Sequence, residues 1–335
     1  MLSGGILIYL SVRYTTKTLL AAISQSGFSV SIDSARLHNM LFEKRILIKG
    51  PKIVAIGGGT GLSTMLRGLK LFSSNITAVV TVADDGGGSG MLRQDLGILP
   101  PGDIRNCILA LADTEPILEK LLQYRFMEGV LKGQSFGNLF LAAMTGISNS
   151  FEEAVRRMSD VLAVTGRVLP VTTENITLCA ELADGTIIRG ESNIGKRENY
   201  LKNPIKRVYL EPEGAMAHHD VIEAIREADV VILGPGSLYT SIIPNLIVGE
   251  VCEEIIQSRA AKIYVCNIMT QPGETDGYAL SQHINALLSH VPKNIMDFCV
   301  VNTTPIPDAL SERYLGEGAA SVEVDCDRVQ SGISI

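Results

Sequence analysis

Tryptophan is absent from this sequence of 335 residues, and aromatic residues make up only 5% of it. Its core must therefore be aliphatic, built from the Ile, Leu and Val side chains that buried parallel sheets favour. Paired cysteines are also missing, because the six cysteines are scattered and form no C-x-x-C pair. This spacing predicts buried free thiols in a reducing compartment and gives no support to a zinc site.

Concentrated positive charge is the next feature that the sequence lacks. The net charge is -7, and no stretch carries a block of Lys and Arg residues. The phosphate-neutralising stripe of a nucleic-acid-binding protein is therefore not expected. Backbone N–H groups at a helix N-terminus can still bind a phosphate, so the net negative charge does not exclude a nucleotide ligand. With 46% apolar and 19% charged residues, the composition is that of a compact globular protein.

Long apolar runs are missing from residues 1–50 as well. Residues 6–10 and 19–23 are apolar, but Arg13 and Lys17 lie between them. A membrane-spanning helix needs about 20 mostly apolar residues, and a secretory signal needs a continuous apolar segment before its cleavage site. We therefore interpret residues 1–50 as a poorly constrained leader, with a peripheral membrane contact through this segment as an alternative.

Alternating strand and helix signals begin after Pro51. A strand, a glycine turn, a helix and a second strand follow one another at 52–56, 62–71 and 76–82. Such a βαβ unit normally lies in a parallel sheet. Further helices are predicted at 104–112, 114–127, 138–144, 151–164, 221–228 and 279–288, and further strands at 229–233, 261–266 and 296–301. We therefore predict an α/β fold, Rossmann-like, with a mostly parallel sheet flanked by helices.

Near residues 168–212 the alternation of strand and helix signals gives way to short β-rich runs, which predict a small β-rich insert. Its hairpin signal is Asp184-Gly185, which lies between two short β-rich runs. The predicted organisation is thus a single nucleotide-binding α/β domain over residues 51–335 that contains this insert.

The first candidate site is the run 57–61 (GGGTG), where the predicted first strand opens into a helix. Glycines let a ligand approach the backbone closely, and a helix N-terminus presents N–H groups and a positive dipole end to phosphate. The dinucleotide fingerprint is incomplete, because Leu62 takes the place of its third glycine, and no P-loop Gly-Lys-Ser/Thr follows. A tight turn without a ligand is the alternative.

The second candidate site follows the second predicted strand, where Asp84 and Asp85 precede a glycine-rich run at 86–90 that contains Ser89. In doubly wound folds an acid at this place can accept hydrogen bonds from ribose hydroxyls. Paired carboxylates can instead hold Mg²⁺ beside a phosphate. A flexible acidic surface loop is the alternative.

Three further turns place polar groups at helix starts or strand ends. Asp103 occupies an N-cap position, and Arg105 beyond it is either a bidentate phosphate clamp or a surface charge. Gly137 and Asn138 lie at the start of an apolar helix. A helix cap is the first interpretation of this pair, and a ligand contact is the second. The turn 234–237 (GPGS) follows a strand, at the edge where open α/β sheets bind ligands, with an ordinary turn as the alternative.

These sites predict ligand contacts from backbone glycines, hydroxyls, carboxylates, amides and one guanidinium. The expected ligand-binding residues are Gly57, Gly58, Gly59, Thr60, Gly61, Asp84, Asp85, Gly86, Gly87, Ser89, Arg105, Asn106, Gly137, Asn138, Gly234, Gly236 and Ser237. No nucleophile elbow or catalytic triad is recognisable. Asp85 is the candidate metal ligand, and it is the candidate catalytic residue if the protein is a transferase.

Five spaced motifs resemble one protein family. They are 56–61 (IGGGTG), 80–90 (VTVADDGGGSG), 99–106 (LPPGDIRN), 135–139 (SFGNL) and 234–237 (GPGS). In this order they resemble the gluconeogenesis-factor family of YvcK-like proteins, which is related to the 2-phospho-L-lactate transferases, the CofD-like proteins. The similarity runs from about Pro51 to the C-terminus. One departure is Gly88, which stands where the family pattern has a serine.

The resemblance implies a Rossmann-like fold and a cytosolic protein linked to carbon metabolism, cell-wall growth and cell shape. It also implies binding of UDP-sugars, chiefly UDP-N-acetylglucosamine, without a well-established reaction. The transferase relatives use Mg²⁺ and join a phospholactyl group to a deazaflavin, and their acid after the second strand matches Asp85 here. Some relatives carry a membrane-attached segment where this chain has residues 1–50.

We therefore expect a cytoplasmic regulatory protein of the gluconeogenesis-factor type, needed for cell shape and cell-wall growth on gluconeogenic carbon sources. Its ligand would be a UDP-sugar or a dinucleotide. Residues 57–61 would cradle the diphosphate, Asp84 or Asp85 would meet the ribose or a Mg²⁺, and Asn138 with the turn 234–237 would close the pocket. We expect a homo-oligomer that binds no nucleic acid and requires no cofactor, with Mg²⁺ as the one candidate.

The main alternative is a Mg²⁺-dependent, phospholactyl-type transferase in which Asp85 and the metal offset the charge of the phosphate as the group moves. A dinucleotide-dependent oxidoreductase has less support, because Leu62 replaces the third glycine of the fingerprint and no hydride-relay residues are recognisable.

Overall fold

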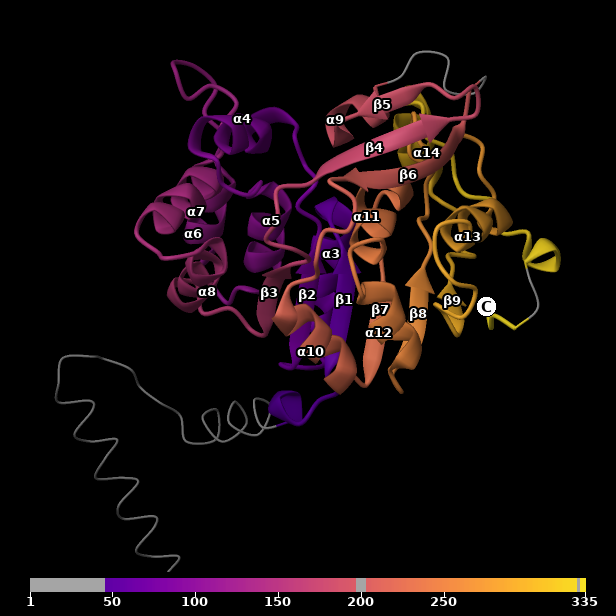
Figure 1. Cartoon of the computed structure of the whole chain (residues 1–335), viewed down its shortest axis with the longest axis horizontal. Coiled ribbons are helices and arrows are strands. Elements are labelled where there is room, and N and C mark those ends of the chain that lie inside the picture. Colours follow the sequence, from indigo (N-terminus) through magenta and orange to yellow (C-terminus); the bar gives the residue numbers. More distant parts are fainter. Residues whose placement is uncertain (1–45, 197–202, 330–331) are drawn as a thin grey trace, which may run out of the picture. The chain divides into compact units, whose positions relative to one another are not determined.

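The central sheet consists of six parallel strands in the order β3-β2-β1-β7-β8-β9. The computed structural model describes residues 46–196, 203–329 and 332–335, so most of the predicted leader at 1–50 lies outside the described residues. The strands are β1 Ile53–Gly57, β2 Ile76–Val80, β3 Arg167–Pro170, β7 Val230–Leu233, β8 Ala261–Val265 and β9 Phe298–Val300 (Figure 1). The predicted Rossmann-like, mostly parallel sheet is confirmed.

Strands β1 and β7 mark the point where the strand order changes direction. From β1 the chain winds to β2 and β3 on one side of the sheet, and it then returns to β7, β8 and β9 on the other side. Ile53 of β1 pairs with Ile76 of β2 and with Val230 of β7, so these strands start level with one another. Open α/β sheets bind ligands outside the carboxyl ends of the strands at such a switch point. The loops that follow β1 and β7 are therefore well placed for a site.

The core of the sheet is aliphatic, as the composition predicts. Every residue of β1 and β2 is buried, and Ile56, Val79 and Val80 have no exposed surface. Full burial of such a side chain stabilises a fold by about 1.5–3 kcal/mol. Strands that are buried on both faces read as continuous apolar runs, which is why sequence analysis located them.

Helices flank this sheet, and α10 and α12 pack against each other in front of it in Figure 1. The helices of at least seven residues are α3 Gly59–Leu69, α4 Gly87–Leu96, α5 Gly102–Leu111, α6 Pro116–Gln123, α7 Phe136–Gly146, α8 Phe151–Val161, α10 His219–Glu227, α12 Val251–Gln257, α13 Leu280–Leu288 and α14 Asp308–Gly316. Among the described residues, none of the helices is both long enough and apolar enough to cross a membrane.

A second, antiparallel sheet has the strand order β5-β4-β6 and forms the predicted β-rich insert. Its strands are β4 Thr177–Leu182, β5 Ile187–Arg189 and β6 Ile205–Glu211, and the short helix α9 Glu191–Ile194 follows β5. In Figure 1 this sheet lies at the top of the molecule. Strand β3 falls partly within the predicted insert but pairs with β2, so the small sheet begins only at Thr177.

Helix α4 was not predicted from the sequence, for which a flexible acidic surface loop at 84–90 was one alternative. The helix begins at Gly87 and continues to Leu96. Glycine weakens an isolated helix by about 0.5–1 kcal/mol per residue relative to alanine, so local propensity does not predict this element. A Cβ atom on Gly90 would lie 2.0 Å from the backbone oxygen of Asp85. The first turn of α4 therefore packs directly on the Asp84–Asp85 turn, and only glycine allows that approach.

The cysteines agree with the prediction in part. All six are free, and Cys107, Cys179, Cys266 and Cys299 are buried. Cys326 differs because it is exposed, on the short 3-10 helix Cys326–Arg328. Cys252 is partly exposed on α12.

Candidate functional site

A cavity of about 1010 Å³ opens at the switch point of the main sheet. Its walls come from the loop between β1 and α3, from the loop after β7 and from residues 266–272 after β8. Of the predicted ligand-binding residues, Gly58, Gly59, Thr60, Gly61, Gly236 and Ser237 line it. The structure thus brings the first candidate site and the 234–237 turn together, although they are far apart in sequence.

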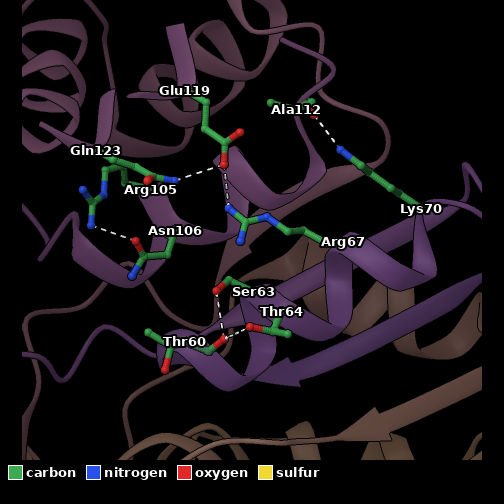
Figure 2. Close-up of polar contacts among 10 residues, drawn as sticks. All are labelled: Thr60, Ser63, Thr64, Arg67, Lys70, Arg105, Asn106, Ala112, Glu119 and Gln123. Carbon is green, nitrogen blue, oxygen red and sulfur yellow. Dashed lines mark hydrogen bonds and ion pairs between the residues drawn. The ribbon is translucent and has the colours of Figure 1, made fainter. Parts of the chain in front are cut away.

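The N-terminus of α3 forms the floor of this cavity at the glycine-rich loop. Its N-cap residue is Gly58, so the helix starts without a capping side chain of its own. The hydroxyl groups of Ser63 and Thr64 donate hydrogen bonds to the Thr60 carbonyl, at 3.0 and 2.8 Å (Figure 2). The first turn has no acidic side chain. The positive end of α3 therefore faces the cavity without a carboxylate on that turn, which suits a phosphate.

Two asparagines hold the loops around the cavity in place. The Asn245 amide donates to the carbonyl oxygen of Gly57 at 2.9 Å and to that of Ser241 at 2.6 Å. The Asn267 side chain makes two hydrogen bonds with the backbone of Gly236, accepting from its N–H at 3.2 Å and donating to its carbonyl at 2.8 Å. Gly57 lies 188 residues from Asn245, and Gly236 lies 31 residues from Asn267. No local sequence pattern therefore identifies these two contacts.

Asp84 and Asp85 are absent from the lining of this cavity, and each makes a contact inside the protein. The Asp84 carboxylate accepts a hydrogen bond from the Gly86 N–H at 2.9 Å. The Asp85 carboxylate accepts one from the Ser192 N–H at 2.8 Å. Since Ser192 belongs to α9, Asp85 fastens the insert to the main domain. This structural role was not apparent from the sequence.

Asp103 is a site residue whose position corrects the sequence analysis. It is not the N-cap of α5, because that helix starts at Gly102 and its N-cap is Pro101. The carboxylate instead lies against the glycine loop, 2.6 Å from where a Cβ on Gly58 would be. Burial, opposed by a hydrogen bond from the Gly59 amide, raises the pKa of Asp103 to about 6. The contact of the Asp103 carboxylate with the backbone of the distant glycine loop thus decides its role.

Glu191 of α9 is a second acid that the sequence analysis missed. Burial and the nearby charges of Asp84, Glu274, Asp103 and Asp85 raise its pKa to about 8. Glu274 is buried and accepts a hydrogen bond from the Thr240 hydroxyl at 3.1 Å. Acids from the loops after β2 and β8, from α5 and from α9 therefore concentrate negative charge at this edge of the sheet.

A divalent cation fits the chemistry of Asp84 and Asp85. Mg²⁺ is usually held by one or two carboxylates together with phosphate oxygens and water. Each carboxylate binds a backbone amide through one oxygen, and its second oxygen makes no hydrogen bond to a described residue. Within the described ranges, three possible ligands gather closely only at His219, Asp220 and Glu223, in the N-terminal half of α10. That surface group does not line the cavity.

Arg105, Asn106, Gly137 and Asn138 lie at the contact between α5 and α7, away from the cavity lining. Arg105 is only 8% exposed. Its guanidinium donates to the Ser135 hydroxyl at 3.0 Å. It also donates to the Asn106 side chain at 2.7 Å, a contact that Figure 2 shows. Ser135 is the N-cap of α7 and accepts from the Asn138 N–H. In this structure the four residues position the start of α7.

Packing explains glycine at position 88 in the glycine-rich run at 86–90. A Cβ on Gly88 would lie 2.8 Å from the Gln134 side-chain oxygen. Gln134 therefore occupies the space that a serine side chain at position 88 would need. Ser89 is buried, and its hydroxyl lies 2.4 Å from where a Cβ on Gly102 would be. The departure at Gly88 is thus matched by a neighbouring side chain.

The substitution Glu191→Gln is expected to flatten the dependence of stability on pH. The pKa values of Glu191 and Asp103 are raised, to about 8 and about 6, from ordinary values of 4.5 and 3.8. Between the ordinary and the raised pKa, the folded protein binds more protons than the unfolded chain, so the free energy of unfolding falls as pH rises. Urea unfolding from about pH 5 to about pH 8, without divalent cations, would measure this slope.

The exposed carboxylate Glu128 offers a matched control, since Glu128→Gln should leave the slope unchanged. Equal slopes in the wild type and in Glu191→Gln would contradict the raised pKa of Glu191.

Comparisons with known proteins agree with this architecture. The family model described as 2-phospho-L-lactate transferase CofD matches residues 53–335. A relative from Clostridium acetobutylicum is 56% identical over 333 residues, which are 98% of this chain and 74% of that protein. A relative from Bacillus subtilis named gluconeogenesis factor is 50% identical over 285 residues, 84% of this chain and 88% of that protein.

A solved structure shows the same fold. The crystal structure of a member of the UPF0052 family from Bacillus halodurans matches with a TM-score of 0.81 and 49% sequence identity. The match covers 85% of this chain and 92% of the other.

Proposed function

The chain belongs to the CofD-like family that includes the gluconeogenesis factors, and from this premise we propose that it is a regulatory protein that binds a nucleotide sugar. The ligand class is that of UDP-N-acetylglucosamine. Its diphosphate lies on residues 57–61, and the turn at Gly236 and Ser237 forms the facing wall.

One observation carries the proposal: the N-terminus of α3, whose first turn has no acidic side chain of its own, faces a cavity at the switch point of the sheet. Backbone N–H groups and the helix dipole favour an anion there. The cavity of about 1010 Å³ lies at the upper end of the range of about 300–1,000 Å³ that is usual for small-molecule sites. The two phosphates and the two sugars of such a ligand would use a space of this size.

The acids support a secondary role for Mg²⁺ in this proposal. Asp84 and Asp85 lie beside the glycine loop without lining the cavity, and Asp85 already holds α9 through Ser192. A bound Mg²⁺ would neutralise phosphate charge. Affinity for the sugar nucleotide therefore depends mainly on the backbone amides and only weakly on the metal.

The biological part of the proposal goes beyond the name gluconeogenesis factor that the relatives carry and takes up what the resemblance to the YvcK-like proteins implies. The protein acts in the cytoplasm, where it supports cell shape and cell-wall growth on gluconeogenic carbon sources. It works as a homo-oligomer and binds no nucleic acid. The net charge of -7 is consistent with the last point.

A Mg²⁺-dependent transferase is the second candidate function, because the matching family model carries a transferase description. The concentration of carboxylates around Glu191 favours it, since a metal held by Asp84 or Asp85 would offset charge on a phosphate during group transfer. In that case Asp85 is required for turnover.

Calorimetric titration of the full chain separates these functions. UDP-N-acetylglucosamine, NADP and GTP would each be titrated with and without Mg²⁺, against the wild type and Asp85→Asn. We expect tight binding of the UDP-sugar alone, and we expect Asp85→Asn to change its Kd by no more than about threefold, because asparagine keeps an acceptor for the Ser192 N–H. GTP binding that requires Mg²⁺, or no binding of the UDP-sugar, would favour the transferase.

A further inference from the structure

Helix α14 has an unusual position at the rim of the cavity. It spans Asp308–Gly316, and none of its nine residues is buried. Isolated helices of this length are marginal in water, because most helix stability in proteins comes from packing of an apolar face. Leu310 is 47% exposed and Tyr314 is 38% exposed. The apolar face of α14 is thus only partly covered by the protein itself.

A hollow of about 330 Å³ lies beneath this face. Leu310 and Tyr314 of α14 form one wall, and Ile268 and Met269 form another. Pro305, Ile306 and Pro307 complete its apolar lining, and we call this space the α14 pouch. Its lining contrasts with the glycines and hydroxyls at the other end of the main cavity.

The α14 pouch is continuous with the main cavity. Ile268, Met269 and Tyr314 line both spaces. A ligand whose diphosphate lies at the N-terminus of α3 therefore has one route along the wall after β8 into an apolar chamber. Because the two spaces share these walls, a part of the same ligand is the occupant that fits the pouch best.

We propose that the α14 pouch receives the nucleobase of the bound nucleotide and that the base packs on the ring of Tyr314. This inference rests on the proposed function and assigns the two ends of its ligand. A sugar has hydroxyls on every side and would leave them unpaired against Ile268, Ile306 and Leu310. A base has apolar faces and a polar edge, which matches a pouch with apolar walls.

Polar groups at the rim of the pouch fit the edge of such a ring. The Asn302 side chain donates to the Thr304 carbonyl at 2.8 Å and accepts from the Thr304 N–H at 3.3 Å. Both residues line the pouch. Their amide groups therefore bring hydrogen-bonding partners to an otherwise apolar space, and base binding covers the exposed face of α14.

The first test measures the affinity of the full-length protein for UDP-N-acetylglucosamine by calorimetry. Tyr314→Ala is expected to raise the Kd about tenfold, which is in the range found when an aromatic platform for a base is removed. Tyr314→Phe keeps the ring and should remain within about twofold of the wild type. Tyr124→Ala is the matched control, since Tyr124 is also exposed but does not line either space, and it should bind normally.

The second test locates the base directly. The 5-iodouracil analogue of the UDP-sugar is bound to the wild-type protein and irradiated, and the cross-linked peptide is identified by mass spectrometry. We expect the cross-link within residues 301–319. A cross-link beside Asp84 and Asp85 would place the base on the opposite side of the glycine loop and overturn the inference.

The possible results distinguish failure of the proposed function from failure of this inference alone. If the wild type binds no nucleotide, the proposed function fails and this inference fails with it. If the wild type binds and Tyr314→Ala binds equally well, the inference alone is wrong. Thermal unfolding of each variant checks that the exposed positions have been changed without loss of the fold.

Discussion

Alanine at Gly59 is expected to weaken binding of UDP-N-acetylglucosamine at least about tenfold, or about 1.4 kcal/mol. Gly59 lines the cavity at the N-terminus of α3. Apart from its chain neighbours and the backbone of its own helix, no atom of the described residues lies within 4 Å of where its Cβ would be. The added methyl group would therefore occupy space that the diphosphate needs, without displacing any part of the protein. Calorimetric titration of the full chain would measure the loss.

The backbone strain of this substitution has a matched control in Gly97. Gly59 has φ of +66° and Gly97 has φ of +67°. At neither position does a described atom beyond the neighbouring backbone lie within 4 Å of where a Cβ would be. Each alanine should therefore cost about 1–2 kcal/mol of stability, the penalty for an L-residue in left-handed backbone. Gly97 is the C-cap of α4 and does not line the cavity. Equal ligand affinities in the two variants would refute the phosphate-cradle role of Gly59.

Alanine at Gly90 is expected to destabilise the protein by at least about 3 kcal/mol, or to prevent it from folding. A Cβ there would lie 2.0 Å from the backbone oxygen of Asp85. That distance is impossible for real atoms, and no flexible side chain can move aside. The substitution must push α4 away from the turn that carries Asp84 and Asp85. Urea unfolding, or the yield of folded protein, would record the effect.

Gly68→Ala provides the opposite result as a control. Gly68 also lies within a helix, α3, but in the described part of the chain no atom outside the backbone of that helix lies within 4 Å of its Cβ position. Alanine there should stabilise the protein by about 0.5–1 kcal/mol, because it lowers the entropy lost on helix formation. A Gly90→Ala protein that unfolds like the wild type but loses its ligand would show that this glycine serves ligand access and not packing.

Local patterns determined most of the main sheet. Strands β1, β2 and β7 are buried on both faces, so each appears in the sequence as a short aliphatic run that ends at glycine or polar residues. The turn at 57–61 could be placed between a strand and a helix for the same reason. Backbone conformation and burial leave such signals because they depend on residues that are adjacent in the chain.

Side-chain partners left no comparable signal. Asp103 reads as a helix cap from its neighbours, yet its carboxylate lies against Gly58, which belongs to a loop that precedes it by one strand and two helices. The glycines at 86–90 have the composition of a loop, yet α4 begins at Gly87 and its first turn packs on the neighbouring Asp85. For Asp103 the deciding contact comes from a distant segment, whereas for α4 it is local and the low helix propensity of glycine hides it.

The sequence by itself determined the fold class, the family and the glycine-rich turn at which a phosphate is expected. Only the tertiary structure decided that this turn shares its cavity with Gly236 and Ser237, while Arg105 and Asn138 do not line that cavity. It also decided that Glu191 joins the acids. The physical reason is that periodicity and turn composition report local backbone geometry, whereas a binding site is a set of distances between residues that the chain alone does not bring together.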